Sequence, residues 1–349
     1  MKKLLRILLA VANVITGLCL LAGAFGGYYD PHVSTVPEAF VLALPVTTLV
    51  MVVVLVLDLV WLRMWAVGAT LLMMLCLPTI MEVFPLNGGP RRLTPVEQER
   101  SFTLMTYNVM NFVNVNADYT RDINPTLEEV MAADPDIVCM QEAEYFCALK
   151  KTCVTKAQID SISARYPYTL MPKQTFMTML SRYPLTLLAD IKEPVMGGTD
   201  IVVVRADIHG EPVVIMSVHL QSIHYIPSDR IGEQVTELDR VLAASALRAD
   251  RAKVLLEAIR EYAPEGRLII CGDFNDVPGC YTLRLLARAG LRSVNTRVGH
   301  GYMPTYNTAR KFFTIDHILY RGALEPVSLT RGNIRNSDHY PLTARFVIE

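Results

Sequence analysis

The stretch Leu268-Ile-Ile-Cys-Gly-Asp-Phe-Asn275 decides the fold and indicates where the function lies. Its first four residues are apolar, which is typical of a strand covered on both faces. The apolar run stops at Gly272, and the polar Asp273 and Asn275 follow directly. Ligands of layered α/β proteins gather at strand ends. Both residues are therefore functional candidates, although a single strand-end Asp or Asn is more often a turn or cap residue.

Five further apolar runs meet polar residues in the same way. The runs and their polar neighbours are Phe102–Tyr107 with Asn108, Asp136–Met140 with Glu142, Pro212–His219 with His219 itself, Phe313–Tyr320 with Asp316, and Leu342–Ile348, which Asp338 and His339 precede. Six such groups in one chain are hard to attribute to turns. We therefore expect a functional site at the strand ends.

The chemistry of these side chains suits a divalent cation and can serve the cleavage of a phosphodiester. Glu142, Asn108 and Asp338 offer hard oxygen ligands without a Cys/His cluster, so Mg²⁺, Mn²⁺ or Ca²⁺ suits them better than zinc. Such a cation polarises a phosphoryl oxygen and screens developing charge. Phosphodiester cleavage also needs an activated water and a protonated leaving group, which carboxylates and imidazoles can supply.

The other patterns of residues 101–349 predict a layered α/β domain. Phe176–Ser181 and Asp200–Ile208 are predicted as strands, and His209-Gly210 predicts a hairpin turn from Asp200–Ile208 to Pro212–His219. Helical patterns cover Pro125–Ala133, Lys156–Arg165, Ala244–Tyr262 and Tyr281–Ala289.

The start of the chain holds its apolar excess. Overall, 52% of the residues are hydrophobic and 19% are charged, whereas about a quarter are charged in average proteins. This composition excludes a disordered chain. The excess lies in Ile7–Tyr29, Ala39–Leu57 and Met64–Met81. A bilayer core needs roughly 20 apolar residues per helix, so three transmembrane helices are predicted. Three runs without a soluble domain between them argue against a cleaved signal peptide.

These patterns divide the chain into a membrane anchor (1–85), a linker with Gly and Pro (86–100) and a large domain (101–349). Basic residues at positions 2, 3 and 6 favour an inside N-terminus, so three crossings place the large domain outside, on the periplasmic side of a bacterial inner membrane. Arg91 and Arg92 favour the opposite orientation. On the outer side, the spacing of Cys147 and Cys153 permits a disulfide but does not establish one.

The strand-end motifs together resemble the endonuclease/exonuclease/phosphatase superfamily, the metal-dependent phosphoesterases of the pancreatic deoxyribonuclease type. The strings that carry the resemblance are Tyr107-Asn108, Gln141-Glu142, Ser181-Arg-Tyr-Pro-Leu185, Val218-His-Leu220, Gly272-Asp-Phe-Asn275, Ile315-Asp-His-Ile318 and Ser337-Asp-His-Tyr-Pro341. The resemblance covers residues 101–349 and none of the first 100. It implies a four-layer α/β sandwich of two mixed β-sheets flanked by helices, preceded here by three transmembrane helices.

By this resemblance, Glu142 is the principal ligand of the metal, Asn108 assists it, and Asp338 lies at the same metal. The metal is expected to be Mg²⁺, with Mn²⁺ or Ca²⁺ as alternatives. Many repair nucleases of the family have an acidic residue two positions after the Asn, but Met110 stands here. This departure argues against a two-metal site and against a close analogy with abasic-site repair enzymes.

The resemblance also implies catalytic roles for five residues. Asp273 orients or deprotonates the attacking water, and Asn275 holds the phosphate beside it. His339 binds the phosphate or acts as the base, and Asp316 fixes its tautomer. His219 occupies the position of the general acid.

Three functions remain open at this stage. The first is a membrane-anchored, Mg²⁺-dependent phosphodiesterase or endonuclease that acts on nucleic acid. The second is a phosphoesterase for lipid headgroups, of the phosphoinositide or sphingomyelin type. The third, a catalytically inactive membrane scaffold, is disfavoured because the polar set is complete. The expected partners are a phosphoester substrate and, through residues 1–85, the lipid bilayer, and the sequence indicates no protein partner.

The charge of residues 101–349 does not favour nucleic acid. Seven of the 33 basic and six of the 34 acidic residues precede position 101, which leaves 26 and 28 and a net charge of −2. Nucleic-acid binding usually needs a basic footprint. Residues 281–335 form a local basic stretch, with nine basic and two acidic residues. This stretch either attracts an anionic substrate or includes a solvated helix face.

Overall fold

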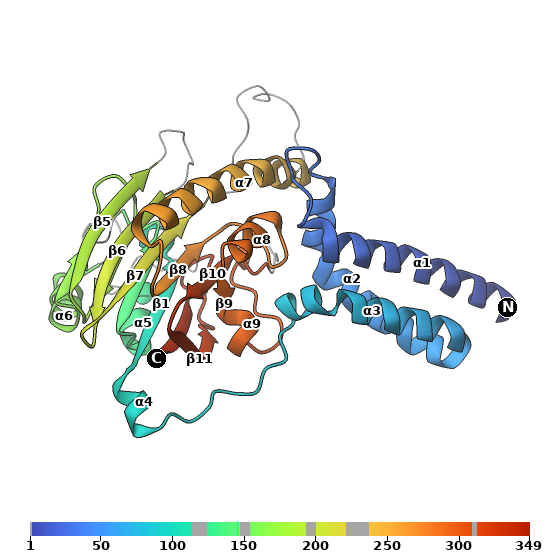
Figure 1. Cartoon of the computed structure of the whole chain (residues 1–349), viewed down its shortest axis with the longest axis horizontal. Coiled ribbons are helices and arrows are strands. Elements are labelled where there is room, and N and C mark those ends of the chain that lie inside the picture. The colour runs from blue at the N-terminus through green and yellow to red at the C-terminus, as the bar shows by residue number, and fades with distance from the viewer. Residues whose placement is uncertain are drawn as a thin grey trace.

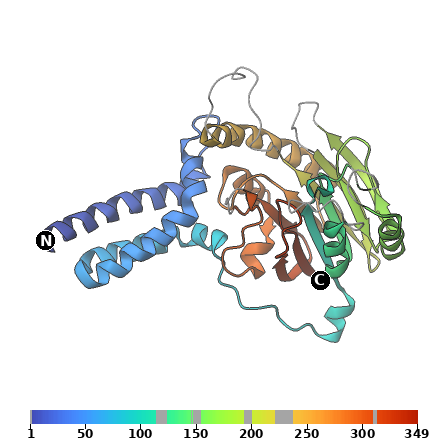
Figure 2. The ribbon, with the colours of Figure 1, turned by 180° about the vertical axis from the view of Figure 1, so that it is seen from behind.

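The computed structural model describes residues 2–113, 124–144, 146, 154–192, 200–220, 237–308 and 313–349. Three long helices project from one side of an α/β domain, and the views from front and back show the same arrangement (Figure 1 and Figure 2). Cys147 and Cys153, for which the sequence permits a disulfide, lie outside the described residues.

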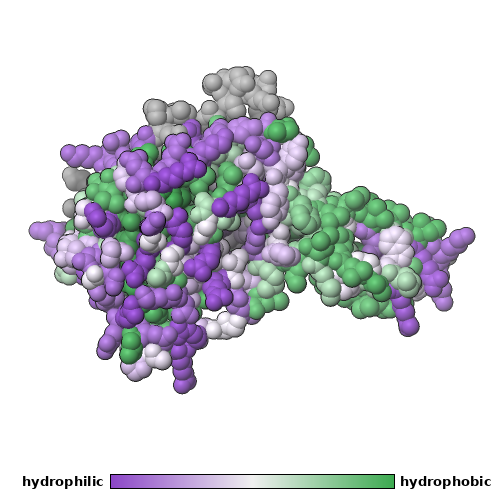
Figure 3. All heavy atoms as spheres, in the orientation of Figure 1, coloured by the Kyte–Doolittle hydropathy of each residue, from purple (hydrophilic) through white to green (hydrophobic). Residues whose placement is uncertain are grey.

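The projecting helices are α1 (Lys2–Gly26), α2 (Val36–Trp61) and α3 (Arg63–Val83). Each is long and apolar enough to cross a membrane, as the sequence predicts. Large apolar side chains point outward from all three, so that this part of the surface is coloured hydrophobic in Figure 3. An apolar surface of this extent requires an apolar environment.

Two features shape this bundle of helices. Asn13 of α1 donates a hydrogen bond through Nδ2 to Oδ1 of Asp58 on α2, at 3.0 Å, and both residues are buried. A polar pair of this kind joins helices inside an apolar bundle. Helix α2 contains Pro45, which cannot donate the helical hydrogen bond at its position. The first part of α2 therefore bends away from the rest and lies along the α/β domain (Figure 1).

The segment after α3 leads to the α/β domain and contains the short helix α4 (Pro95–Glu99). Thr94 caps this helix: its hydroxyl accepts from the Glu97 amide, and the Glu97 carboxylate accepts from the Thr94 amide. Such a capping box satisfies two amides that the first helical turn leaves unpaired.

Two six-stranded sheets form the centre of the α/β domain. The first sheet has the order β11 (Leu324–Arg331), β12 (Leu342–Ile348), β1 (Ser101–Asn108), β2 (Ile137–Gln141), β4 (Thr178–Ser181) and β3 (Tyr168–Leu170). The second has the order β5 (Leu185–Lys192), β6 (Asp200–Ile208), β7 (Glu211–His219), β8 (Leu268–Asp273), β10 (Asp316–Arg321) and β9 (Arg292–Ser293). Both sheets are mixed, since β1 pairs with β2 and β7 with β8 in parallel, whereas the other pairs are antiparallel.

Helices cover the outer faces of the two sheets and complete four layers. They are α5 (Pro125–Ala133), α6 (Lys156–Arg165), α7 (Glu237–Tyr262) and α8 (Tyr281–Arg288). The short helix α9 (Val294–Val298) instead packs through Val294 on the core between the two sheets. Buried apolar residues of both sheets form the central core, α5 and α6 pack on the first sheet, and α7 and α8 pack on the second. The predicted four-layer sandwich is thus confirmed. The predicted strands and helices recur with shifts at their ends, and the largest are the start of β10 at Asp316 and of α7 at Glu237.

The sequence misses four strands, each at or next to a sheet edge. In β5, the residues Thr186 and Leu187 are exposed, so its pattern is not continuously apolar. Strand β11 contains Pro326 at an irregularity in its pairing with β12, a position to which edge strands confine proline. Strands β3 and β9 have only three and two residues. The predicted hairpin at His209-Gly210 is present, and both residues have positive φ, as a type I′ turn requires.

Candidate active site

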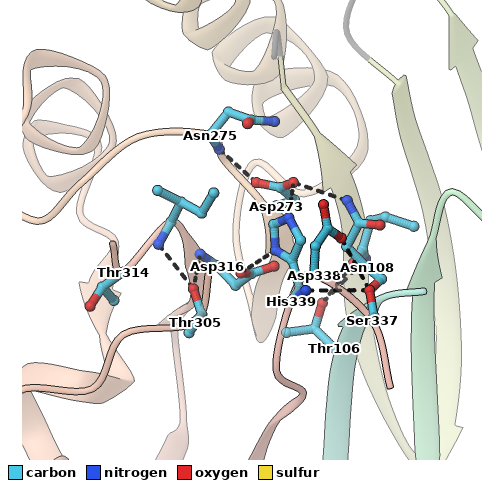
Figure 4. Close-up of polar contacts among 12 residues, drawn as sticks. Thr106, Asn108, Asp273, Asn275, Thr305, Thr314, Asp316, Ser337, Asp338 and His339 are labelled. Atoms are coloured by element: carbon cyan, nitrogen blue, oxygen red, sulfur yellow. Dashed lines mark hydrogen bonds and ion pairs between the residues drawn. The ribbon is translucent and has the colours of Figure 1, made fainter. Parts of the chain in front are cut away.

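Strand register brings the polar strand-end residues together. In the second sheet, Asp273 at the end of β8 pairs with His219 on β7 and with Asp316 on β10. In the first sheet, Asn108 at the end of β1 pairs with Gln141, and Glu142 follows β2 directly. The sheets face each other, so these ends lie at one edge of the sandwich. Figure 4 shows the resulting cluster around Asp273.

Asp273 occupies the centre of this cluster and is 1% exposed. Its Oδ1 accepts from the backbone amide of Asn275 at 2.8 Å, and its Oδ2 accepts from Nδ2 of Asn108 at 3.1 Å. The Nε2 atoms of His339 and His219 lie 3.5 and 3.7 Å from the same Oδ2. Burial raises the pKa of the Asp273 carboxyl, His339 opposes this shift, and the negative charge of Asp316 adds to it.

Asp316 and His339 form the shortest contact of the cluster that involves an imidazole. Oδ2 of Asp316 lies 2.8 Å from Nδ1 of His339, and both residues are almost completely buried. Burial alone lowers the pKa of His339, but the charges of Asp316 and Asp273 outweigh burial and raise it to about 10. The Thr305 hydroxyl accepts from the Asp316 amide, and the Tyr306 ring stands edge-on to the imidazole. His339 is therefore held in a fixed orientation.

Glu142 and Asn108 lie on the other side of Asp273. Nδ2 of Asn108 donates to Oε1 of Glu142 at 3.0 Å, and Nε2 of His219 lies 3.7 Å from the same oxygen. Glu142 has φ 48° and Asn275 has φ 51°. Non-glycine residues in this region of φ are strained, and such strain is concentrated at functional sites. The side chain of Glu142 is 36% exposed, so solvent reaches this side of the cluster.

Asp338 joins the cluster from the segment before β12. Ser337 donates to the backbone oxygen of Asn108 at 2.8 Å and also contacts Oδ1 of Asp338 at 3.2 Å. This contact fixes the C-terminal segment to the end of β1. Burial raises the pKa of the Asp338 carboxyl, the charge of His339 opposes the shift, and the charge of Glu142 adds to it.

The donor set fits a hard divalent cation. Four carboxylates, those of Glu142, Asp273, Asp316 and Asp338, share the cluster with two imidazoles. The raised pKa values of Asp273 and Asp338 reflect negative charge that burial leaves poorly solvated, and a cation would relieve this cost. Oδ1 of Asp316 is buried and has no hydrogen-bond partner among the described residues.

The distances between possible ligand atoms indicate a different group of three metal ligands from Asn108, Glu142 and Asp338, which the sequence predicts. Ligand atoms of Asp273, Asp316 and His339 all lie within 4.8 Å of one another. However, Asp316 already bonds to His339, so this trio is better explained as a hydrogen-bonded Asp316–His339 pair with the Asp273 carboxylate close to the same imidazole. Asn108 presents Nδ2 to Glu142, while its Oδ1 accepts from the Met110 amide. Asn108 can ligate a metal beside Glu142 through Oδ1 only if its side-chain amide is flipped, which exchanges Oδ1 and Nδ2. The two orientations of an Asn amide differ only in their hydrogen bonds.

Some residues of the cluster were not foreseen as site residues. Gln141 is fully buried and donates to Ser217 at 3.0 Å, which ties the two sheets together beside the site. Asn307 is 7% exposed, its backbone amide donates to the Asp338 carbonyl, and neither polar atom of its side chain has a partner among the described residues. No periodicity marks Asn307 in the sequence. Arg182 lies elsewhere, in ion pairs with Asp134 and Asp136.

Comparison with known proteins agrees with this fold. Chains of known structure include an endonuclease/exonuclease/phosphatase from Beutenbergia cavernae, with 17% identity, a TM-score of 0.51, and coverage of 71% of this chain and 72% of that one. The human nocturnin catalytic domain with bound sulfate anion has 17% identity, a TM-score of 0.50, and coverage of 72% and 95%. A comparison with curated proteins finds no match.

Two sheets with a carboxylate and imidazole cluster at their strand ends support a phosphoester hydrolase. The profile of the Endonuclease/Exonuclease/phosphatase family matches residues 105–339, about two thirds of the sequence. The chain therefore belongs to this family, as the resemblance of its motifs predicts.

Proposed function

We propose that the chain is a membrane-anchored, divalent-metal-dependent phosphodiesterase of the endonuclease type, which cleaves a phosphoester bond by attack of water. The observation that carries this proposal is the continuous polar network around Asp273. It joins Asp316, His339, Asn108 and Glu142 through contacts of 2.8 to 3.5 Å. These residues come from separate strands and loops, so their convergence is not explained by a local turn.

The metal would be held by Glu142 and Asp338, with Asn108 after its amide is turned. Oxygen ligands of this kind favour Mg²⁺, with Mn²⁺ or Ca²⁺ as alternatives. When bound, such a cation polarises a phosphoryl oxygen and screens the charge that develops on it.

Asp273 and Asn275 would act on the attacking water and the phosphate. A buried carboxylate whose pKa is raised is a better proton acceptor than an exposed one, so Asp273 is suited to orient water and to take its proton. Asn275 lies beside it and is anchored by a bond from its Nδ2 to the Leu220 carbonyl. The second Nδ2 hydrogen of Asn275 remains for a phosphate oxygen.

The two histidines would have different roles. His339 has a pKa of about 10 without a metal, so its ring is an imidazolium at neutral pH. Nδ1 donates to Asp316, and Nε2 can donate to a phosphate oxygen. His219 is 20% exposed and faces the more open side of the cluster near Glu142. It is placed to protonate the leaving oxygen as general acid.

A lipid headgroup is the second candidate for the substrate. Helix α8 follows Asn275 after a short loop and lies beside the apolar helices (Figure 1), which favours a substrate at the membrane surface. The net charge of −2 over residues 101–349 gives no general attraction to nucleic acid. An inactive scaffold is disfavoured because each polar member of the cluster is present.

The test is a hydrolysis assay of the full chain in detergent. Plasmid DNA, RNA, inositol phosphates and sphingomyelin vesicles are compared with Mg²⁺, with Mn²⁺, with Ca²⁺ and with EDTA. We expect turnover of one substrate class that EDTA abolishes and Mg²⁺ restores. Turnover that survives EDTA contradicts the metal requirement, and no turnover of any class with any of these ions supports the scaffold. Carbonate extraction of membranes tests the anchor separately, because an integral protein stays in the pellet.

A further inference from the structure

The loop that leaves the active site runs directly to the projecting helices. After Asn275, residues 276–280 lead to the start of α8 at Tyr281. Gly27, just after α1, packs on this loop so closely that a Cβ there would lie 1.8 Å from the Gly279 carbonyl oxygen. A side chain at position 27 is therefore incompatible with the observed contact. The loop that holds Asn275 is in backbone contact with the anchor.

Glu38 of α2 makes a polar contact with the same loop. It is 7% exposed, and its Oε1 accepts from the Tyr281 backbone amide at 3.1 Å. This amide belongs to the first turn of α8, where backbone donors have no partner within the helix. Glu38 therefore caps a helix of the α/β domain from the anchor.

A buried ion pair holds Asp276, the first residue of the loop. Nε of Arg248 on α7 lies 3.2 Å from Oδ2 of Asp276, and the two side chains are 3% and 6% exposed. Asp276 follows Asn275, and its carbonyl oxygen lies 2.8 Å from Nε2 of His317, the neighbour of Asp316. The charge of Glu38 acts on both members of the ion pair. A change at Glu38 thus reaches the loop through Asp276 as well as through Tyr281.

Further contacts join the anchor to the α/β domain around this loop. Nη1 of Arg284 on α8 bonds to Oε1 of Glu82 on α3 at 2.5 Å, and its guanidinium lies over the Tyr28 ring. His32, between α1 and α2, lies 3.0 Å from Asp250 of α7. All three projecting helices or their connections therefore contact the α/β domain. A flexible tether would join the two parts without such contacts.

We propose that the anchor is docked on the α/β domain as part of the catalytic unit, and that Glu38 is a positioning residue for Asn275 and Asp273. The role of Glu38 rests on the proposed hydrolase function, whereas the docking does not. Glu38 does not touch the site and acts through the loop 276–281. Displacements of about 1 Å in a catalytic group can cost about 100-fold in rate, so a loosened loop lowers kcat by a larger factor than it raises KM.

The docking is tested by cutting the linker. A protease site is placed at Gly88-Gly89, where an added Cβ meets nothing within 4 Å, and the full chain is cleaved in detergent. We expect the α/β domain to stay with the anchor on gel filtration. The variant Gly27→Leu should release the domain, whereas Gly68→Leu, at a position with open space around it, should not. Release of the domain from the cleaved wild type, or its retention in Gly27→Leu, overturns the docking.

The role of Glu38 is tested by kinetics on a confirmed substrate. We expect Glu38→Ala to lower kcat about tenfold, a loss within the range that misplaced groups produce, with a smaller rise in KM because Asn275 also holds the phosphate. Glu38→Gln should recover most of kcat because its side-chain oxygen accepts the same bond, and Glu99→Ala, at an exposed position of α4, serves as the control. Wild-type kcat in Glu38→Ala, or equal losses in the Ala and Gln variants, overturns the positioning role.

The two tests separate the proposals. If the cleaved domain stays bound but no substrate is turned over, the hydrolase function fails and the docking stands. If Glu38→Ala does not fold, Glu38→Ser offers a smaller change, and a wild-type kcat in that variant counts against the positioning role.

Discussion

The Asp316 carboxylate and the His339 imidazole lie 2.8 Å apart in the interior of the protein, although 23 positions separate them in the chain. The contact is oriented on both sides, since Thr305 holds the Asp316 backbone and Tyr306 stands against the imidazole. It fixes the orientation of the His339 ring, with Nδ1 on Asp316 and Nε2 turned away from it. The first two predictions follow from this pair.

Asp316→Asn should lower kcat by about 100-fold or more, because His339 loses the partner that fixes its orientation and maintains its positive charge. Steady-state kinetics of the full chain measure the effect. Asp207→Asn, on strand β6 and exposed, is the control and should leave kcat unchanged. Equal kcat in Asp316→Asn and the wild type would show that the pair has no catalytic role.

The same pair predicts how stability depends on pH in the metal-free protein. The pKa of His339 is raised from 6.5 to about 10 in the folded state. A raised pKa means that the pair stabilises the fold fully below about pH 6.5 and loses this effect as pH rises through 10. The unfolding temperature of the wild type in EDTA should exceed that of Asp316→Asn most at pH 6 and least above pH 10. A gap that widens with rising pH contradicts the assignment.

Glu142→Gln should keep the fold and lose most turnover, because a neutral amide binds a divalent cation less well than a carboxylate does. Metal charge stabilisation is worth several kcal/mol, which corresponds to a loss of about 100-fold or more. Glu144→Gln is the matched control, since Glu144 is exposed and lies two positions away. Near-wild-type turnover by Glu142→Gln would refute the metal assignment.

His219→Ala should discriminate between leaving groups. A general acid matters most when the leaving oxygen is basic, so cleavage of an alkyl phosphodiester should slow by about 100-fold. Hydrolysis of a p-nitrophenyl phosphodiester, whose leaving group needs no proton, should change little. Equal losses on both substrates would mean that His219 acts on the metal site or the phosphate instead.

The orientation of the anchor can be read from reporter fusions in a bacterial host. Basic residues at positions 2, 3 and 6 and the three apolar helices predict an exported α/β domain. Alkaline phosphatase fused after Glu349 should be active there, and a fluorescent protein that needs the cytosol should be dark. Fusions after Arg63, at the start of α3, should give the reverse pattern. A bright C-terminal fusion places the site in the cytoplasm.

The sequence predicts the central strands because these are covered on both faces. Leu268–Asp273 is buried at every position, so its apolar run is unbroken and its polar end is conspicuous. Edge strands lack this signal, and β11 even contains Pro326, so sequence alone cannot distinguish it from a loop. The register that pairs Asp273 with His219 and Asp316 is likewise a property of the folded sheet, although the order of the motifs hints at it.

Long-range packing explains the rest of what the sequence does not reveal. Asn307 lies in a segment without periodicity and enters the site only because its backbone pairs with Asp338. Glu38 lies directly before the apolar run Ala39–Leu57, and nothing near it in the sequence indicates Tyr281 as its partner. Contacts of this kind depend on how the two parts of the chain are placed.

The position of β1 between β2 and β12 has a consequence for biosynthesis. Ser101 pairs with Val347, so the first sheet cannot close until the chain has left the ribosome as far as residue 347. At roughly 5–20 residues per second, β1 waits about 12–50 s for its partner, while the three apolar helices have already been synthesised. Asp338 and His339 emerge last of the site residues. A nascent chain that has not yet reached these two residues therefore lacks a complete site.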